Sequence, residues 1–251
     1  MKMWKILAFA GLCSISFSSP PEDKITIYLI GDSTIANKET KAYPETGWGM
    51  PFRYFFDSTV FVDNRAKNGR STRTFLSENL WNPIYQNLKA GDYVFIQFGH
   101  NDESKEKADR YATPDEYKSN LMRFISDTRR KKATPVLLTP VARRRFKDGK
   151  IQESHEEYSR LVNEVAHSEK VAFIDLDTRS RELLQKYGEE ASKLLFLQLE
   201  PGEHPNYPDG KNDNTHFSET GARLIAEIVL AEVRKLNLEL SNHIVKPQVR
   251  K

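Results

Sequence analysis

Short apolar runs rich in β-branched and aromatic residues alternate along the chain with longer stretches whose apolar positions repeat at helical spacing. The runs predict five buried strands, over 25–30, 60–62, 92–98, 135–140 and 171–176. Alternating strands and helices are typical of a single doubly wound α/β domain. We therefore expect a flavodoxin-like fold whose five-stranded, mainly parallel sheet is flanked by helices.

Turn and capping residues locate the predicted helices between these strands. Helices are expected after Pro51, over 72–80, after the capping sequence that starts at Thr113, over 158–166, around Leu183 and after Ser218. Gly188 is expected to end the helix around Leu183 as its C′ residue. The stretch from Leu199 to Asn214 is rich in Pro, Gly, Asn and Asp and is expected to be one long loop.

Polar residues follow three of the predicted strands, where the strands of an open α/β sheet present ligand-binding side chains. The first strand ends in Gly31-Asp32-Ser33-Thr34, the second leads to Gly69 and the third ends before Asn101. The last loop adds Asp213, three residues before His216. Considered alone, each residue could have a purely structural role. Ser33 could cap a helix, and Asp213 could form a loop hydrogen bond with His216. Together they indicate one site.

This set contains the groups that acyl transfer requires. Ser33 is predicted to be the nucleophile, His216 the general base, and Asp213 the carboxylate that orients the imidazole and stabilises its protonated form. The backbone N–H groups of Ser33 and Gly69 and the side-chain amide of Asn101 are predicted to form the oxyanion hole. The remaining histidines lack metal-ligand spacing, and no metal or cofactor is expected.

The four blocks that carry these residues, at Gly31-Asp32-Ser33-Thr34, Gly69, Gly99-His100-Asn101-Asp102 and Asp213-x-x-His216, resemble those of the SGNH (GDSL-type) hydrolases. Further segments resemble the rhamnogalacturonan acetylesterases of carbohydrate esterase family 12: 47–49, 68–71, 91–94 and 98–102. The resemblance runs from about Ile25 to the final helix. It implies deacetylation of a pectin backbone without a metal or organic cofactor.

Three further residues are candidates for substrate binding. Arg143 and Arg144 follow the fourth strand and could bind carboxylates of an acidic polysaccharide, or form internal salt bridges. Trp48 could stack on a sugar or be a buried aromatic residue. His100 is interpreted as a packing or hydrogen-bonding residue of its turn and not as a base.

Other function classes remain as alternatives or are excluded by pattern. A GDSL-type esterase for acetylated xylan or lipid acyl esters remains open, as does a non-catalytic carbohydrate-binding module. The chain has no Gly-x-Ser-x-Gly, Walker or Gly-x-Gly-x-x-Gly sequence, which argues against ordinary α/β-hydrolases and nucleotide binding. Without Lys2 and Lys5, 36 basic residues against 35 acidic ones leave a charge of +1, so nucleic acid is not an expected partner.

The first 19 residues have the layout of a secretory signal peptide. A basic start, with Lys2 and Lys5, precedes an apolar run that is too short to span a bilayer comfortably, and residues 20–251 form the expected esterase domain. Export to the periplasm or the extracellular space is the prediction, with no membrane insertion of the mature domain. Acylation of Cys13 as a lipoprotein is the alternative, although Leu12 precedes it where a small residue is expected.

Overall fold

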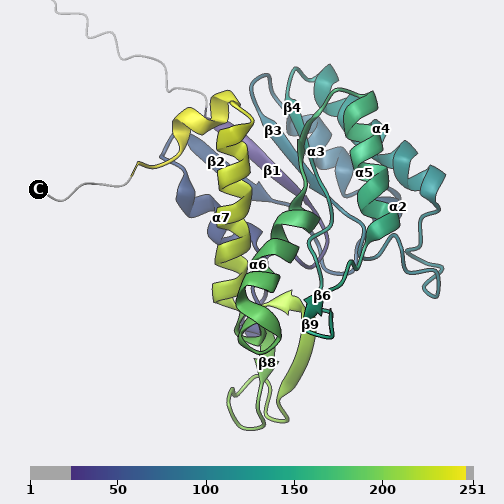
Figure 1. Cartoon of the computed structure of the whole chain (residues 1–251). Coiled ribbons are helices and arrows are strands. Elements are labelled where there is room, and N and C mark those ends of the chain that lie inside the picture. The colour runs from purple at the N-terminus through teal and green to yellow at the C-terminus, as the bar shows by residue number, and fades with distance from the viewer. Residues whose placement is uncertain (1–23, 247–251) are drawn as a thin grey trace, which may run out of the picture.

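A parallel five-stranded sheet lies at the centre of the computed structural model, which describes residues 24–246 (Figure 1). Its strands are β1 (Ile25–Gly31), β2 (Val60–Asn64), β3 (Tyr93–Gln97), β4 (Thr134–Leu138) and β7 (Ala172–Ile174). They lie in the order β2-β1-β3-β4-β7, and every neighbouring pair is parallel. The predicted doubly wound, flavodoxin-like fold is confirmed. In this order the connections leave β1 and β3 in opposite directions, which opens a crevice beyond their carboxyl ends.

Helices cover both faces of the sheet (Figure 1). One face packs against α1 (Gly49–Phe52), α6 (Leu176–Ala191) and α7 (Glu219–Lys235). The other packs against α2 (Thr72–Ser77), α3 (Trp81–Asn87), α4 (Pro114–Arg130) and α5 (Glu156–Ser168). Strand β1 supplies both layers, because Ile27 and Leu29 face the first group while Tyr28 and Ile30 face the second. A strand buried on both sides reads as a continuous apolar run, as β1 does.

The predicted caps explain where several helices begin. The Thr113 hydroxyl accepts the Glu116 N–H at 3.3 Å, and the Ser218 hydroxyl accepts the Gly221 N–H at 3.2 Å. Helix α6 leaves helical geometry at Gly188, whose φ of 74° lies in the left-handed region, and then continues to Ala191. Short 3-10 helices complete the helical elements, at Thr40–Ala42, Arg53–Phe55, Ser192–Leu195 and Glu239–His243.

The prediction of one long loop from Leu199 to Asn214 is wrong. Strand β8 (Phe196–Leu199) pairs in antiparallel fashion with β9 (Lys211–Phe217), so only the residues between them form a loop. The sequence of β9 is polar almost throughout, which removes the alternation that identifies a strand. A second antiparallel pair, β5 (Phe146–Lys147) with β6 (Lys150–Ile151), was also not predicted.

The predicted signal peptide, residues 1–19, and Cys13 lie outside the described residues. Among residues 24–246, no helix has the length and apolar character needed to cross a bilayer.

Candidate active site

Ser33, His216 and Asp213 lie in hydrogen-bonding contact although Ser33 is 183 residues from His216 in the sequence. Ser33 follows β1, whereas His216 and Asp213 lie on β9. The Nε2 atom of His216 is 2.8 Å from the Ser33 hydroxyl, and its Nδ1 atom is 2.8 Å from Asp213 Oδ2. A hydroxyl, an imidazole and a carboxylate in this order can pass the hydroxyl proton to the ring while the ring stays oriented.

The Asp213 carboxylate is held ionised. Its Oδ1 atom accepts the backbone N–H groups of Thr215 and His216 at 2.8 and 2.9 Å. Partial burial works to raise the pKa of Asp213, but the hydrogen bonds and the charge of the His216 ring outweigh burial and hold this pKa well below its usual range. The carboxylate is therefore available to stabilise a protonated His216.

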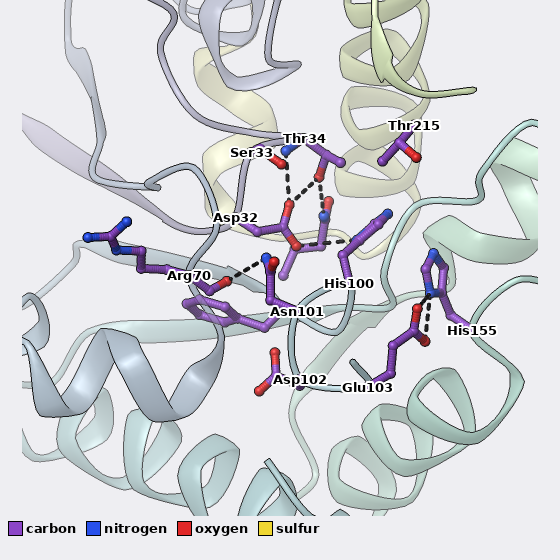
Figure 2. Close-up of polar contacts among 12 residues, drawn as sticks. Asp32, Ser33, Thr34, Arg70, His100, Asn101, Asp102, Glu103, His155 and Thr215 are labelled. Atoms are coloured by element: carbon purple, nitrogen blue, oxygen red, sulfur yellow. Dashed lines mark hydrogen bonds and ion pairs between the residues drawn. The ribbon is translucent and has the colours of Figure 1, made fainter. Parts of the chain in front are cut away.

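Residues with hydrogen-bond donors, Gly69 and Asn101, line the same cavity as Ser33. Within residues 24–246, neither the Ser33 nor the Gly69 backbone N–H has a hydrogen-bond acceptor. Gly69 has a φ of 76°, a conformation that strains any residue with a Cβ atom. Asn101 donates from Nδ2 to the Arg70 carbonyl at 3.0 Å, which leaves one amide hydrogen of this group for a ligand (Figure 2). The Nη1 atom of Arg110 donates to Asn101 Oδ1 at 3.3 Å and fixes the amide orientation.

A buried hydrogen-bond chain supports the turn that carries Ser33. The indole N–H of Trp48 donates to Gln97 Oε1, and Gln97 Nε2 donates to the Thr34 hydroxyl, both at 2.8 Å. That hydroxyl donates to Asp32 Oδ1 at 2.8 Å, and the Thr34 N–H donates to the same oxygen at 2.9 Å. The prediction that Trp48 binds substrate is wrong, because its side chain is fully buried and its polar atom is used inside the protein.

Behind this turn, Asp32 and His100 form a buried pair (Figure 2). Asp32 Oδ2 lies 3.3 Å from His100 Nδ1, and the His100 ring lies 4.2 Å from that of His155, centroid to centroid. Burial and the nearby His155 lower the pKa of His100 to about 4. Burial opposes ionisation of Asp32, but the His100 ring and the Thr34 N–H and hydroxyl outweigh it and hold the pKa of Asp32 below its usual range. The neutral, buried His100 agrees with its interpretation as a packing residue.

The two candidate arginines have different surroundings. Arg143 lines the cavity around Ser33, and its Nη1 atom donates to the Thr215 hydroxyl at 2.5 Å. Arg144 lies outside that cavity. Its guanidinium donates to Ser192 Oγ at 3.1 Å, to Asn214 Oδ1 at 2.9 Å and to the Glu189 carbonyl. These contacts join β9 to the end of α6, and substrate binding by Arg144 stays a prediction.

The cavity in front of Ser33 has a volume of about 370 Å³ and polar walls. It is lined by Ser33, Glu45, Asn68, Gly69, His100, Asn101, Ser104, Lys107, Arg110, Arg143, Thr215 and His216. Among residues 24–246, no group of three or more His, Cys, Asp or Glu side chains is arranged to hold a metal ion. Sequence reasoning missed Glu45, Lys107 and Arg110, because charged residues in loops carry no periodic signal that distinguishes a cavity wall from solvent-exposed chain.

The fold and the site define a class of hydrolase. The chain belongs to the GDSL-like lipase/acylhydrolase family, whose model matches residues 29–224. It is thus a carboxylic ester hydrolase, and the resemblance seen in its sequence blocks is confirmed.

Individual relatives support this assignment over most of the chain. The rhamnogalacturonan acetylesterase RhgT of Bacillus subtilis is 40% identical over 222 residues, which cover 88% of this chain and 94% of the relative. The probable rhamnogalacturonan acetylesterase YesY of the same organism is 35% identical over 221 residues, or 88% and 97% of the two chains. A crystal structure of YxiM from Bacillus subtilis superposes with a TM-score of 0.75 and 26% identity, covering 87% of this chain and 58% of that one.

Proposed function

We propose that this protein is an exported carbohydrate acetylesterase that removes O-acetyl groups from rhamnogalacturonan through a Ser33–His216–Asp213 triad. The observation that most directly supports this triad is the distance of 2.8 Å between His216 Nε2 and the Ser33 hydroxyl, with Asp213 on the other ring nitrogen. The names of two relatives that match along most of the chain support the substrate.

The reaction has two steps, acetylation of Ser33 and hydrolysis of the acetylated Ser33. The Ser33 oxygen attacks the acetyl carbonyl carbon while His216 takes the hydroxyl proton, and the carbonyl oxygen becomes an oxyanion. The N–H groups of Ser33 and Gly69 and the Asn101 amide donate to that oxyanion. When the ester C–O bond breaks, His216 gives the proton to the sugar oxygen and leaves an acetylated Ser33. Water then attacks the acetyl group, loses its proton to His216, and acetate departs as Ser33 regains the proton.

The character of the cavity supports a sugar ester over a lipid ester. Its lining residues are charged, hydroxyl-bearing, amide or histidine side chains together with Gly69, so a long acyl chain would find no apolar wall. Hydroxyl-rich sugars, in contrast, can hydrogen-bond to these polar side chains. Acetylated xylan shares this hydroxyl chemistry and is the closest competitor among substrates.

The test is acetate release from acetylated rhamnogalacturonan, acetylated xylan and long-chain acyl esters by the wild type, Ser33→Ala and His216→Ala. Acetate should come mainly from rhamnogalacturonan, and each variant should lose it. Ser77→Ala and His167→Ala are matched controls, because both residues are exposed on helices away from the cavity. Retained turnover in the Ser33 and His216 variants would refute the triad. Glycan binding without turnover in the wild type would instead identify a carbohydrate-binding module.

Export is supported by the sequence pattern of residues 1–19. Its test is fractionation of cells expressing the full chain, with mass spectrometry of the mature N-terminus. A trimmed, unmodified N-terminus outside the cytoplasm supports a cleaved signal peptide, whereas an acylated Cys13 supports a lipid anchor. An intact chain in the cytoplasm contradicts export.

A further inference from the structure

A second cavity lies apart from Ser33, where the edge strand β2 meets the beginning of α7. Its volume of about 480 Å³ is within the usual range of ligand sites. Asn64 of β2 and Glu219 and Arg223 of α7 belong to its lining. No serine, cysteine or histidine among residues 24–246 lines this cavity, so it can hold a ligand but lacks a nucleophile and a base of the kind proposed at Ser33.

Two exposed tyrosines line this second cavity, which we call the tyrosine cavity. Tyr43 is 46% exposed and Tyr54 is 65% exposed. The Tyr43 hydroxyl donates to Glu219 Oε2 at 2.7 Å. Arg53 Nη2 donates to the Tyr54 hydroxyl at 2.5 Å, and the guanidinium carbon of Arg53 lies 4.6 Å from the centroid of that ring. Both rings are therefore oriented while much of their surface is exposed, which lowers the ordering cost when a ligand packs against them.

Polar side chains lie beside the two rings. Asn64 Nδ2 donates to Asn37 Oδ1 at 3.0 Å, so the Asn37 amide is oriented and its N–H groups are left as donors. Tyr43 uses one carboxylate oxygen of Glu219, which leaves the other as an acceptor. The flat face of a pyranose ring carries C–H groups that pack on aromatic rings, and its edge carries hydroxyl groups that pair with amides and carboxylates. Tyrosines with an amide and a carboxylate in one cavity therefore match a sugar residue.

The tyrosine cavity is linked to the cavity in front of Ser33. A third hollow shares Asn37 with the tyrosine cavity and Asn68 with the Ser33 cavity. In the strand order β2-β1-β3-β4-β7, Ser33 follows β1, and β2 is the outer neighbour of β1. A molecule that extends from Ser33 across the carboxyl end of β2 therefore passes along all three hollows.

We propose that the tyrosine cavity binds a sugar residue further along the polysaccharide chain whose acetyl ester lies at Ser33. This second sugar-binding site rests on the proposed deacetylation at Ser33. Its occupant is the same polysaccharide chain, because the shared hollow leads from one cavity to the other. The contact is equally strong before and during the reaction, so it lowers KM for long substrates without raising kcat. A small acetyl ester does not reach the tyrosine cavity and gains nothing from it.

The first test is the binding of chemically deacetylated rhamnogalacturonan, measured by isothermal titration calorimetry. The wild type should bind it, and Tyr54→Ala should bind it about tenfold more weakly, because the ring face is lost. Tyr54→Phe keeps the ring and should bind within about twofold of the wild type. The second test is the ratio of kcat/KM on acetylated rhamnogalacturonan to kcat/KM on p-nitrophenyl acetate. Tyr54→Ala should lower this ratio about tenfold, through KM for the polysaccharide.

Tyr187→Ala is the matched control, since Tyr187 is 39% exposed on α6 and does not line the tyrosine cavity. Its affinity and its ratio should equal those of the wild type. Equal values in Tyr54→Ala and Tyr187→Ala would overturn the second sugar site while leaving deacetylation intact. A wild-type dimer that Tyr54→Ala abolishes, seen by analytical ultracentrifugation without a change in polysaccharide binding, would also overturn it and identify a second copy of the chain as the occupant. Failure to release acetate from either substrate would overturn the proposed function itself, on which the calorimetric test does not depend.

Discussion

The Lys38 ammonium donates to the carbonyl oxygen of Ser33 across 2.6 Å. It also donates to Asn68 Oδ1 at 2.9 Å and forms an ion pair with Glu45 at 2.6 Å. The Lys38 side chain is only 2% exposed, so this cation is buried with three partners. One residue thereby joins the backbone of the proposed nucleophile to the segment before Gly69 and to a carboxylate that lines the cavity.

We predict that Lys38→Met lowers kcat about tenfold or more on a small acetyl ester and also lowers Tm, because it frees the Ser33 turn and leaves the largely buried Glu45 unpaired. Activity assays and thermal unfolding measure the two effects. Lys67→Met, at an exposed position in the segment after β2, should change neither. The double variant Lys38→Met/Glu45→Gln should recover much of the Tm but not kcat. Recovery of kcat in the double variant would contradict a positioning role for Lys38.

Replacing the orienting carboxylate tests the triad without a large change in shape. Asp213→Asn should lower kcat about a thousandfold or more, because a neutral amide neither stabilises protonated His216 nor maintains its tautomer. The depressed pKa of Asp213 implies that this carboxylate stays ionised in weakly acidic buffer, so protonation of Asp213 should cause no loss of wild-type activity between pH 5 and 7. Single-turnover and steady-state assays across pH measure both effects. Asp209→Asn, in the exposed loop after β8, should behave as the wild type. A small loss in Asp213→Asn would remove this residue from the mechanism.

Asn101 provides a separate test of the oxyanion hole. Asn101→Ala should lower kcat by about 100-fold or more with little change in KM, since the amide is proposed to bind the charge that develops in the transition state. Steady-state kinetics on a small acetyl ester measure this split. Asn163→Ala, on the exposed face of α5, is the control. A rise in KM at constant kcat would show instead that Asn101 contributes ordinary substrate binding.

The sequence predicts those parts of the site that depend on strand ends. Ser33 and Asn101 follow apolar runs, and parallel strands must bring their carboxyl ends to one edge, so their meeting is predictable. The spacing of Asp213 and His216 predicts this pair, but the polar sequence of β9, which holds both residues, does not predict a strand. The partners of Lys38 and the burial of Trp48 were not predictable in this way, because both depend on how separate loops pack in three dimensions.

Asp102 is a buried acid whose environment makes stability depend on pH. Its Oδ1 atom accepts the Thr72 N–H at 2.8 Å and the Thr72 hydroxyl at 2.6 Å, while Oδ2 is buried without a partner among the described residues. Burial is the main cause that raises the pKa of Asp102 to about 7; the Thr72 hydrogen bonds oppose it, and the charge of Asp32 adds to it. In the unfolded chain the pKa of this carboxyl lies near the ordinary aspartate value of 3.8.

Between these two pKa values the folded protein holds a proton that the unfolded chain has released, so this group makes the free energy of unfolding fall as pH rises from about 4 to about 7. Asp102→Asn cannot titrate and should lack that component. The free energy of unfolding of the wild type minus that of Asp102→Asn should decrease by about 2 kcal/mol from pH 5 to pH 8. Urea unfolding of both proteins at the two pH values measures this difference. The contributions of Asp32 and His100 titration to the free energy of unfolding are present in both proteins and therefore largely cancel. Asp109→Asn replaces an exposed carboxylate, so its free energy of unfolding should change with pH as that of the wild type does. A difference that stays constant with pH would show that Asp102 is ionised throughout and that Thr72 compensates for its burial.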